Sequence, residues 1–246
     1  MTNSMQEQVG SQESRRARLQ HLAVTAASRT GTKMMLLAAP GGYLRQTGWI
    51  RSARARRPVD AQGDPQPWLT MPAIAFLDER LRRVSTLFEY GSGGSTAWFC
   101  ERVPHVTSVE HHRAWYEEVR HRLPAAADLH LIATDAPGRF LDLVFRPLGT
   151  PTEYADAIGQ LASEPPDVVV VDGIDRLNCI AATLMIAAPH TTLIVDNLEY
   201  AAEFAPALVL LEQHGYRRLD LWGVSPGELR TSCTSVVYRD GNCLGI

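Results

Sequence analysis

Short apolar runs alternate with longer amphipathic stretches over residues 73–246. Each run is rich in valine, leucine or isoleucine and ends at a turn that contains glycine or a polar residue. Such runs predict buried strands, and the stretches between them predict helices. Their alternation predicts an α/β domain in which helices cover both faces of a parallel sheet. The predicted strands of this part are residues 84–89, 106–109, 129–133, 168–171 and 193–195, and the predicted helices include 72–82, 178–187 and 201–214.

Two further apolar stretches close the chain. Residues 216–222 and 233–238 are typical of strands, and residues 223–227, which include glycine and proline, predict a turn between them. We therefore expect a final pair of neighbouring strands at the edge of the sheet.

The first 72 residues lack this alternation. Residues 1–14 are polar and rich in Gln and Ser, which predicts a disordered tail. Residues 15–39 are mostly good helix formers and predict one or two helices. Residues 48–68 carry several prolines without a regular period, which predicts a long loop. Residues 15–72 are thus expected to form a helical extension with a lid, followed by a domain over residues 73–246.

Composition narrows the class of protein further. The 246 residues suffice for one large α/β domain with an added N-terminal piece. A net charge of -3 argues against a general nucleic-acid-binding surface. The arginines concentrate at Arg51, Arg54, Arg56 and Arg57, a run that is either a solvated face or a contact for an anionic substrate.

Features that the sequence lacks predict the cellular location and the partners of the protein. The four cysteines show no C-x-x-C spacing, which argues against a zinc knuckle and favours reduced cytosolic thiols. No apolar run is long enough to span a bilayer, and the first residues lack a signal-peptide core. We expect a cytoplasmic protein with no membrane or nucleic-acid partner. The extension is rich in Leu and Met and could pack against a second subunit, so a homodimer is a possible assembly.

A glycine-rich turn follows the first predicted strand. The strand ends at Glu89 and opens into Gly91, Ser92 and Gly93. Glycine lets the chain turn sharply and lets the backbone approach a ligand closely. A second acid, Glu110, ends the next predicted strand about 20 residues later, where a carboxylate can accept both ribose hydroxyls of a nucleoside. The stretch predicts a nucleoside cofactor site.

Two departures from the dinucleotide-binding pattern change the expected ligand. The third glycine position holds Ser95 or Thr96, and Glu89 stands just before the turn. A carboxylate there would repel a pyrophosphate, but it suits a cationic group such as an amino acid ammonium. The pattern therefore favours S-adenosylmethionine over NAD. The alternative is an ordinary strand-to-helix turn with a solvated Glu110.

In these residues the chain resembles the class I S-adenosylmethionine-dependent methyltransferases. In that family the acid before the loop, the loop backbone and the acid that ends the second strand hold the amino acid, the sulfur region and the ribose of the cofactor. By resemblance, Glu89, Gly91, Gly93 and Glu110 take those roles. The resemblance covers residues 70–240 and implies a doubly wound, mostly parallel seven-stranded sheet whose last strand is antiparallel.

Three more acids end predicted strands, namely Asp135, Asp172 and Asp196. Ligands of open α/β sheets bind beyond the carboxyl ends of the strands, so these acids are expected at one edge together with Glu89 and Glu110. Asp135 with Ala136 would lie near the adenine. The complete set of candidate cofactor-binding residues is Glu89, Gly91, Ser92, Gly93, Ser95, Thr96, Glu110, His111, Asp135, Ala136 and Asp172.

The ends of the fourth and fifth predicted strands suggest a metal site. Asp172, Asp196 and Asn197 would present three hard oxygen ligands around one point, which suits Mg²⁺ completed by water and substrate oxygens. This arrangement resembles the catechol-type metal-dependent O-methyltransferases, although residues 173–176 depart from that subgroup. In the alternative interpretation Asp172 is a general base or substrate ligand, and Asp196 and Asn197 hold the loop.

Methyl transfer from a sulfonium requires alignment of the reacting groups and exclusion of water. Trp49, Trp68 and Met71 are candidates for the wall of an apolar substrate pocket, or for packing of the extension onto the domain. Tyr154 could reach the site as a catalytic group, or cap a helix.

The expected function is S-adenosylmethionine-dependent O- or N-methylation of a small molecule in specialised metabolism. Transfer or cyclisation of the aminocarboxypropyl arm would use the same pocket. A catalytically silent cofactor-binding or dimerising module is the alternative outside the enzymes. An NAD-dependent oxidoreductase is disfavoured by Glu89 and by the missing third glycine.

Overall fold

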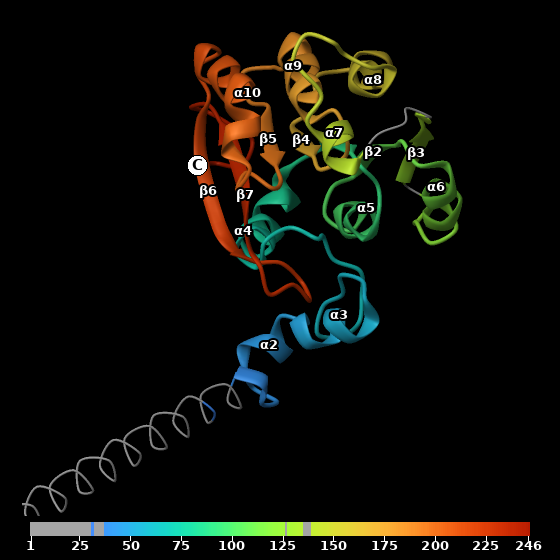
Figure 1. Cartoon of the computed structure of the whole chain (residues 1–246), viewed down its shortest axis with the longest axis vertical. Helices are drawn as coiled ribbons and strands as arrows, with labels where there is room; N and C mark the ends of the chain where they lie inside the picture. The colour runs from blue at the N-terminus through green and yellow to red at the C-terminus, as the bar shows by residue number, and fades with distance from the viewer. Residues whose placement is uncertain (1–30, 32–36, 126, 135–138) are drawn as a thin grey trace, which may run out of the picture.

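The computed structural model describes residue 31 and residues 37–125, 127–134 and 139–246 (Figure 1). Within these ranges the chain forms a seven-stranded sheet with the order β3-β2-β1-β4-β5-β7-β6. The strands are β1 Thr86–Tyr90, β2 His105–Glu110, β3 Ala127–Leu131, β4 Val168–Val171, β5 Thr192–Val195, β6 Arg217–Val224 and β7 Thr231–Tyr238.

The expected sheet topology is confirmed. Strands β1 to β5 pair in parallel with their neighbours, whereas β7 runs antiparallel to both β5 and β6. Strands β2 and β3 are added on one side of β1, and β4 and β5 on the other, so the strand order switches between β1 and β4. Open α/β sheets bind ligands beyond the carboxyl ends of the strands at such a switch.

Successive side chains of the central strands pack alternately into two hydrophobic cores, one on each face of the sheet. Val169 and Val171 of β4 belong to one core, and Val168 and Val170 belong to the other. All four are buried, and each contributes about 1.5–3 kcal/mol when its side chain leaves water. This explains why β4 is an uninterrupted apolar run rather than an alternating one.

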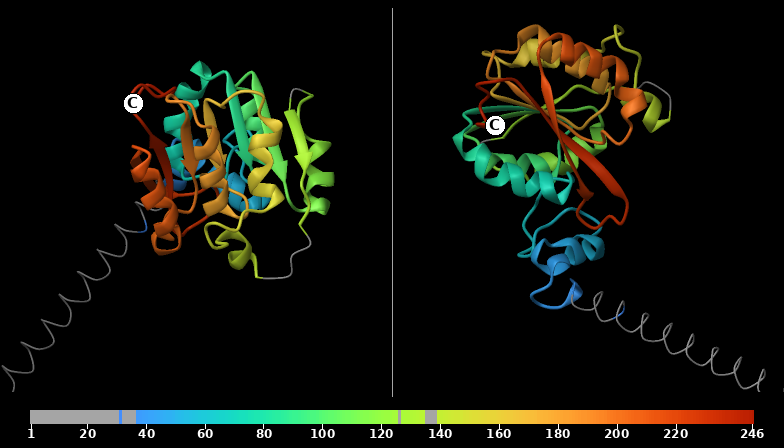
Figure 2. Two further views of the ribbon diagram at one scale, coloured as in Figure 1. Left: turned by 90° about the horizontal axis from the view of Figure 1, so that it is seen from above. Right: turned by 90° about the vertical axis from the view of Figure 1, so that its left-hand side faces the viewer.

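Helices cover the two faces of the sheet (Figure 2). The core on one face includes residues from α7, α8, α9 and α10, and the core on the other includes residues from α4 and α5. The helices are α2 Tyr43–Gln46, α3 Trp49–Ala55, α4 Met71–Arg80, α5 Gly94–Cys100, α6 Arg113–Arg120, α7 Phe140–Val144, α8 Glu153–Leu161, α9 Arg176–Ile186 and α10 Ala201–Gln213, and a 3-10 turn spans Leu81–Arg83.

The prediction of an irregular loop over residues 48–68 is wrong for its first part, because residues 49–55 form helix α3. Gly48 precedes the helix as its N-cap and has a left-handed backbone with a φ of 75°, which glycine adopts without strain. The helix ends at Arg56, also left-handed. Sequence periodicity missed a helix this short because it buries only Ser52, so no apolar stripe marks it.

Residues 43–70, the part of the predicted extension to which this name is restricted from here on, lie at the carboxyl edge of the sheet (Figure 1). The indole Nε1 of Trp49 donates to the carbonyl of Glu228 at 2.8 Å, in the turn between β6 and β7. A Cβ atom on Gly94, at the start of α5, would lie 3.2 Å from the carbonyl oxygen of Gln66. The extension thus bridges the turn after β6 and the helix that follows the glycine turn.

Thr70 joins the extension to the sheet. Its backbone N–H donates to the hydroxyl of Thr234 on β7 at 3.0 Å, and its own hydroxyl donates to the carbonyl of Leu221 on β6 at 2.9 Å. Helix α4 follows directly and buries Met71, Ala73 and Leu77. The start of α4 is therefore fixed against the antiparallel end of the sheet.

Element boundaries differ from the predictions by a few residues. Strand β3 begins at Ala127 rather than at residue 129, because its pairing with β2 from Val106 onward sets its register. The strands β6 and β7 leave a turn over residues 225–230. The predicted tail of residues 1–14 and most of the predicted helices of residues 15–39 lie outside the described residues. In the part of the chain that is described, the helices are too short or too polar to cross a bilayer.

We expect Gly227→Ala to loosen the extension. Gly227 has a φ of 78°, and a Cβ atom on it would lie 2.8 Å from the backbone nitrogen of Ala53 in α3. Gly241→Ala is the matched control, since Gly241 has a φ of 73° but no heavy atom within 4 Å of the added Cβ. Both variants should lose about 1–2 kcal/mol from the left-handed backbone. Only Gly227→Ala should speed hydrogen exchange of the amides in residues 49–55. Equal exchange in the two variants would contradict the packing of α3 against the turn between β6 and β7.

Candidate functional site

The turn after β1 requires glycine at Gly91. Its φ is 97°, and its backbone N–H donates to the carbonyl of Val109 on β2 at 2.9 Å. A Cβ atom on Gly91 would lie 3.0 Å from the Cα of Gly173, in the turn after β4. The two turns therefore touch through their backbones, and a side chain would force them apart.

The side chain of Glu89 is enclosed, with none of its surface exposed. Three hydroxyl groups donate to its carboxylate: those of Ser95 at 2.5 Å, Thr96 at 2.6 Å and Ser108 at 2.5 Å. The first two come from α5 and the third from β2, where Ser108 is the register partner of Glu89. The hydroxyl of Thr96 also accepts from the backbone N–H of Gly93 at 3.0 Å.

Ser95 and Thr96 thus hold the carboxylate of Glu89, and their predicted contact with a cofactor stays a prediction. Burial raises the pKa of Glu89 to about 7, although the three hydroxyl hydrogen bonds oppose the rise. Because the carboxylate is covered, Glu89 contacts helix α5 through the hydroxyls of Ser95 and Thr96. Its predicted direct contact with an ammonium group stays a prediction.

Glu110 at the end of β2 is a charged acceptor. Its Oε2 atom accepts from the backbone N–H and the hydroxyl of Ser92, at 3.1 and 2.9 Å. Its Oε1 atom accepts from the backbone N–H groups of His111 and His112, and it lies 3.1 Å from Nδ1 of His111. Burial alone would raise the pKa of Glu110, but these hydrogen bonds outweigh it and lower the pKa, so the group is ionised at neutral pH.

Trp115 on α6 lies against the glycine turn. Its Nε1 donates to the carbonyl of Ser92 at 2.8 Å, and its ring lies 3.8 Å from the position of a Cβ atom on Gly93. This aromatic residue, together with Glu110, links β2 and α6 to the turn after β1. Asp135 and Ala136, predicted near the adenine, lie outside the described residues.

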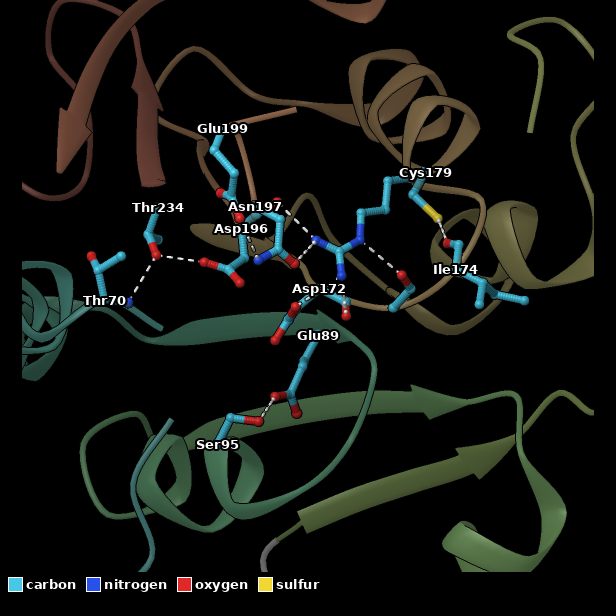
Figure 3. Close-up of polar contacts among 12 residues, drawn as sticks. Thr70, Glu89, Ser95, Asp172, Ile174, Cys179, Asp196, Asn197, Glu199 and Thr234 are labelled. Carbon is cyan, nitrogen blue, oxygen red and sulfur yellow. Dashed lines mark hydrogen bonds and ion pairs between the residues drawn. The ribbon is translucent and has the colours of Figure 1, made fainter. Parts of the chain in front are cut away.

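Asp172, Asp196 and Asn197 come together as the sequence predicts (Figure 3). Arg176 of α9 lies among them. Its guanidinium donates to Oδ1 of Asp172 at 3.0 Å and to Oδ1 of Asn197 at 3.1 Å. The hydroxyl of Thr234 donates to Oδ1 of Asp196 at 2.5 Å.

These contacts do not fit a bound Mg²⁺ ion, because the positive guanidinium of Arg176 already lies against two of the three predicted ligand side chains and Thr234 donates to the third. Among the described residues, no group of three or more His, Cys, Asp and Glu side chains is arranged to hold a metal ion.

The two aspartates of this cluster differ in exposure. The side chain of Asp172 is 27% exposed, whereas Asp196 is buried. Burial raises the pKa of Asp172, and the Arg176 guanidinium limits the rise. Burial and then repulsion by Asp172 raise the pKa of Asp196 to about 8. Of the acids that end β1, β4 and β5, Asp172 is the one that remains accessible.

Tyr154 on α8 reaches the turn after β4 from inside the protein. It is buried, and a Cβ atom on Gly173 would lie 2.0 Å from its hydroxyl oxygen. Burial raises the pKa of Tyr154 well above its usual value, so the phenol keeps its proton at neutral pH. Its ring also meets the ring of His111 edge-on, with centroids 5.9 Å apart. Tyr154 can therefore donate a hydrogen bond in this place but does not act as a base.

The predicted pocket-wall residues are spread over the extension and α4. Trp49 is used to anchor α3 on the turn after β6, Trp68 is 46% exposed, and Met71 is buried at the start of α4. Their role toward a substrate stays a prediction. Arg51 and Arg54 line a hollow of about 520 Å³ on the extension, together with Arg45.

Three residues that complete the site were not identified from the sequence. Ser108 carried a signal, because it is a polar residue between Val106 and Val109 at a buried position, opposite Glu89. Arg176 carried another, since it follows Asp172 by four residues at the start of a helix. Thr234 carried none, because its contact with Asp196 depends on the pairing of β5 with β7.

Comparison with known proteins identifies the fold. No family model and no curated protein matches the sequence. An O-methyltransferase from Streptomyces achromogenes involved in tomaymycin synthesis, solved in complex with S-adenosylmethionine, is 16% identical with a TM-score of 0.52, over 77% of this chain and 87% of that chain. An O-methyltransferase from Bacillus cereus, solved in complex with S-adenosylhomocysteine, is 15% identical with a TM-score of 0.51, over 81% of this chain and 91% of that one. The chain thus has the class I methyltransferase fold that its sequence resembles.

We expect Glu89→Gln to remove a pH dependence of stability. The raised pKa of Glu89 means that its contribution to stability is complete below its ordinary pKa of 4.5 and is lost as the pH rises through about 7. The loss in the wild type amounts to about 3 kcal/mol. Urea unfolding between about pH 5 and pH 8 should therefore show the variant gaining stability relative to the wild type as the pH rises. Exposed Glu118→Gln is the control, and a difference for Glu89→Gln that stays constant with pH would contradict the burial of this charge.

Proposed function

We propose that the protein is an S-adenosylmethionine-dependent methyltransferase. The observation that carries the proposal is the set of carboxylates around the turn of Gly91. Glu89 precedes the turn, Glu110 holds it through Ser92, and a Cβ atom on Gly91 would lie 3.2 Å from the backbone of Asp172. A nucleoside with a cationic sulfonium and an ammonium group suits this place, whereas the pyrophosphate of NAD would be repelled.

The residues present fit this cofactor. Glu110 is ionised at the end of β2, where the proposal places the ribose, and the close approach of Gly91 and Gly173 leaves backbone rather than side chains at the turn. We place the adenine by Asp135, Ala136 and His111, following the order of the strand ends.

When bound, S-adenosylmethionine supplies a methyl group on a sulfonium, a leaving group that needs no further activation. The work left to the chain is to orient the acceptor and to take its proton. Asp172 accepts the proton of the acceptor's hydroxyl or amine in this proposal, because its side chain is accessible and its Oδ1 is fixed by Arg176. The phenol of Tyr154 keeps its proton beside the turn after β4, where it is available as a hydrogen-bond donor.

The acceptor in this proposal is a small molecule, methylated on oxygen or nitrogen in specialised metabolism. The extension supports it, since residues 43–70 are fixed at the carboxyl edge, where they can cover a small acceptor. The Streptomyces neighbour, an O-methyltransferase involved in tomaymycin synthesis, has the same fold. A cytoplasmic location and a homodimer through the extension stay predictions.

Calorimetry tests the cofactor. We expect the protein to bind S-adenosylhomocysteine and not NAD, and Glu110→Ala to bind the former at least about tenfold more weakly, because a charged hydrogen-bond acceptor is lost. Glu118→Ala is the matched control, since Glu118 lies on α6 with its carboxylate in a solvent-exposed pair with Arg122. Tight binding of NAD, or an affinity for S-adenosylhomocysteine unchanged by Glu110→Ala, would sink the assignment.

The by-product of turnover separates the possible reactions. Methyl transfer should release S-adenosylhomocysteine, detected by mass spectrometry after incubation with candidate acceptors. Release of methylthioadenosine instead would establish aminocarboxypropyl transfer or cyclisation. Binding of the cofactor without either product would be the behaviour of a silent module.

A further inference from the structure

The guanidinium of Arg176 lies at the point where the ends of β4 and β5 meet. Its Nε donates to the carbonyl of Gly173 at 2.8 Å. One terminal nitrogen donates to the carbonyl of Asp196 at 2.8 Å and to the side chain of Asn197 at 3.1 Å. The other donates to the carbonyl and the carboxylate of Asp172 at 2.9 and 3.0 Å. All of its N–H donors are thus used on these two turns.

This guanidinium is a buried charge in an acidic surrounding. The side chain of Arg176 is only 3% exposed, and Asp172 is its ion-pair partner. Asp196 lies close enough to be repelled by Asp172 and attracted by Arg176. A buried charge is tolerated when it is paired and fully hydrogen-bonded, and Arg176 meets both conditions.

The backbone on both sides is arranged to hold Arg176. Asp175, immediately before it, has a left-handed φ of 51°, and Asn197 has a φ of 61°. Such conformations cost free energy in residues other than glycine and persist where surrounding contacts determine them. Asp175 is fixed by the hydroxyl of Thr152 at 2.8 Å and by the side-chain amide of Asn178 at 2.6 Å.

We infer that Arg176 is the resident cation of this site and takes the place that a divalent metal would hold between Asp172, Asp196 and Asn197. Oδ1 of Asp172 and Oδ1 of Asn197 already accept from Arg176, and Oδ1 of Asp196 accepts from Thr234, so one oxygen of each predicted metal ligand is engaged. A second cation brought to the same oxygens would face the positive charge of the guanidinium directly.

One consequence concerns the acceptor and rests on the proposed function. A metal selects substrates that chelate it through neighbouring oxygen atoms. With Arg176 in that place, the acceptor is oriented by the accessible Asp172 and by its fit under the extension, so a pair of adjacent hydroxyls is not required. The acceptor class is therefore one that needs only one nucleophilic hydroxyl or amine.

Electron paramagnetic resonance of Mn²⁺ tests the inference without an activity assay. The full-length wild type, with and without S-adenosylhomocysteine, should leave the signal of free Mn²⁺ at its amplitude in buffer. Arg176→Gln, which keeps the length of the side chain and removes its charge, should bind Mn²⁺ at least about tenfold more tightly than the wild type. Arg120→Gln is the control, because Arg120 forms an exposed ion pair with Glu117 on α6.

Two outcomes would overturn the inference. One is stoichiometric loss of the free Mn²⁺ signal in the wild type that Asn197→Ala abolishes. The other is a folded Arg176→Gln variant that binds Mn²⁺ no better than the wild type. If Arg176→Gln does not fold, the Mn²⁺ titrations of the wild type and of Asn197→Ala still test the inference, because they show whether the wild type binds a metal ion at this site.

A calorimetric measurement separates this inference from the proposed function. The affinity of the wild type for S-adenosylhomocysteine should stay within about twofold in excess EDTA and in excess Mg²⁺. A loss of about tenfold or more in EDTA would overturn the role of Arg176. No binding of S-adenosylhomocysteine under any condition would reject the proposed cofactor, while the Mn²⁺ titration would still report on Arg176.

Discussion

Repulsion between carboxylates is the constraint that shapes the carboxyl edge of this sheet. Parallel strands bring their ends together, and four of them end in an acid: Glu89, Glu110, Asp172 and Asp196. Each carboxylate is stabilised by different partners, because each has different neighbours. Hydroxyls surround Glu89, backbone N–H groups satisfy Glu110, a guanidinium pairs with Asp172, and Asp196 shares a hydrogen bond with Thr234. These hydrogen bonds and the ion pair fix the shapes of the turns at the site.

The same contacts connect the acids to distant parts of the chain. Asp196 is held by Thr234, Thr234 accepts from the backbone of Thr70, and Thr70 begins the helix that follows the extension. The acid at the end of β5 and the segment at the edge of the sheet are thus parts of one hydrogen-bonded chain. An acceptor bound under the extension would meet a surface whose position depends on that acid.

The sequence was informative where local pattern decides structure. The uniform valines of β4, the glycine turn after Glu89 and the final strand pair all followed from residue type and order, and the structure agrees with them. Helix α3 was missed because it is short and mostly exposed. Arg176 was missed as a functional residue because a spacing of four residues indicates nearness but not which side-chain oxygens the guanidinium reaches. Enclosure of Glu89 depends on Ser108, whose nearness is set by strand register rather than by sequence distance.

The packing of Gly91, Gly173 and Tyr154 limits how this sequence can drift over evolution. Any side chain at Gly173 would collide with the phenol of Tyr154, and any side chain at Gly91 would collide with the backbone at Gly173. A side chain at Gly173 is tolerated only together with a smaller residue at position 154, whereas Gly91 is also restricted by its own φ of 97°. Homologues with the same site should therefore keep glycine at position 91 and change positions 154 and 173 jointly.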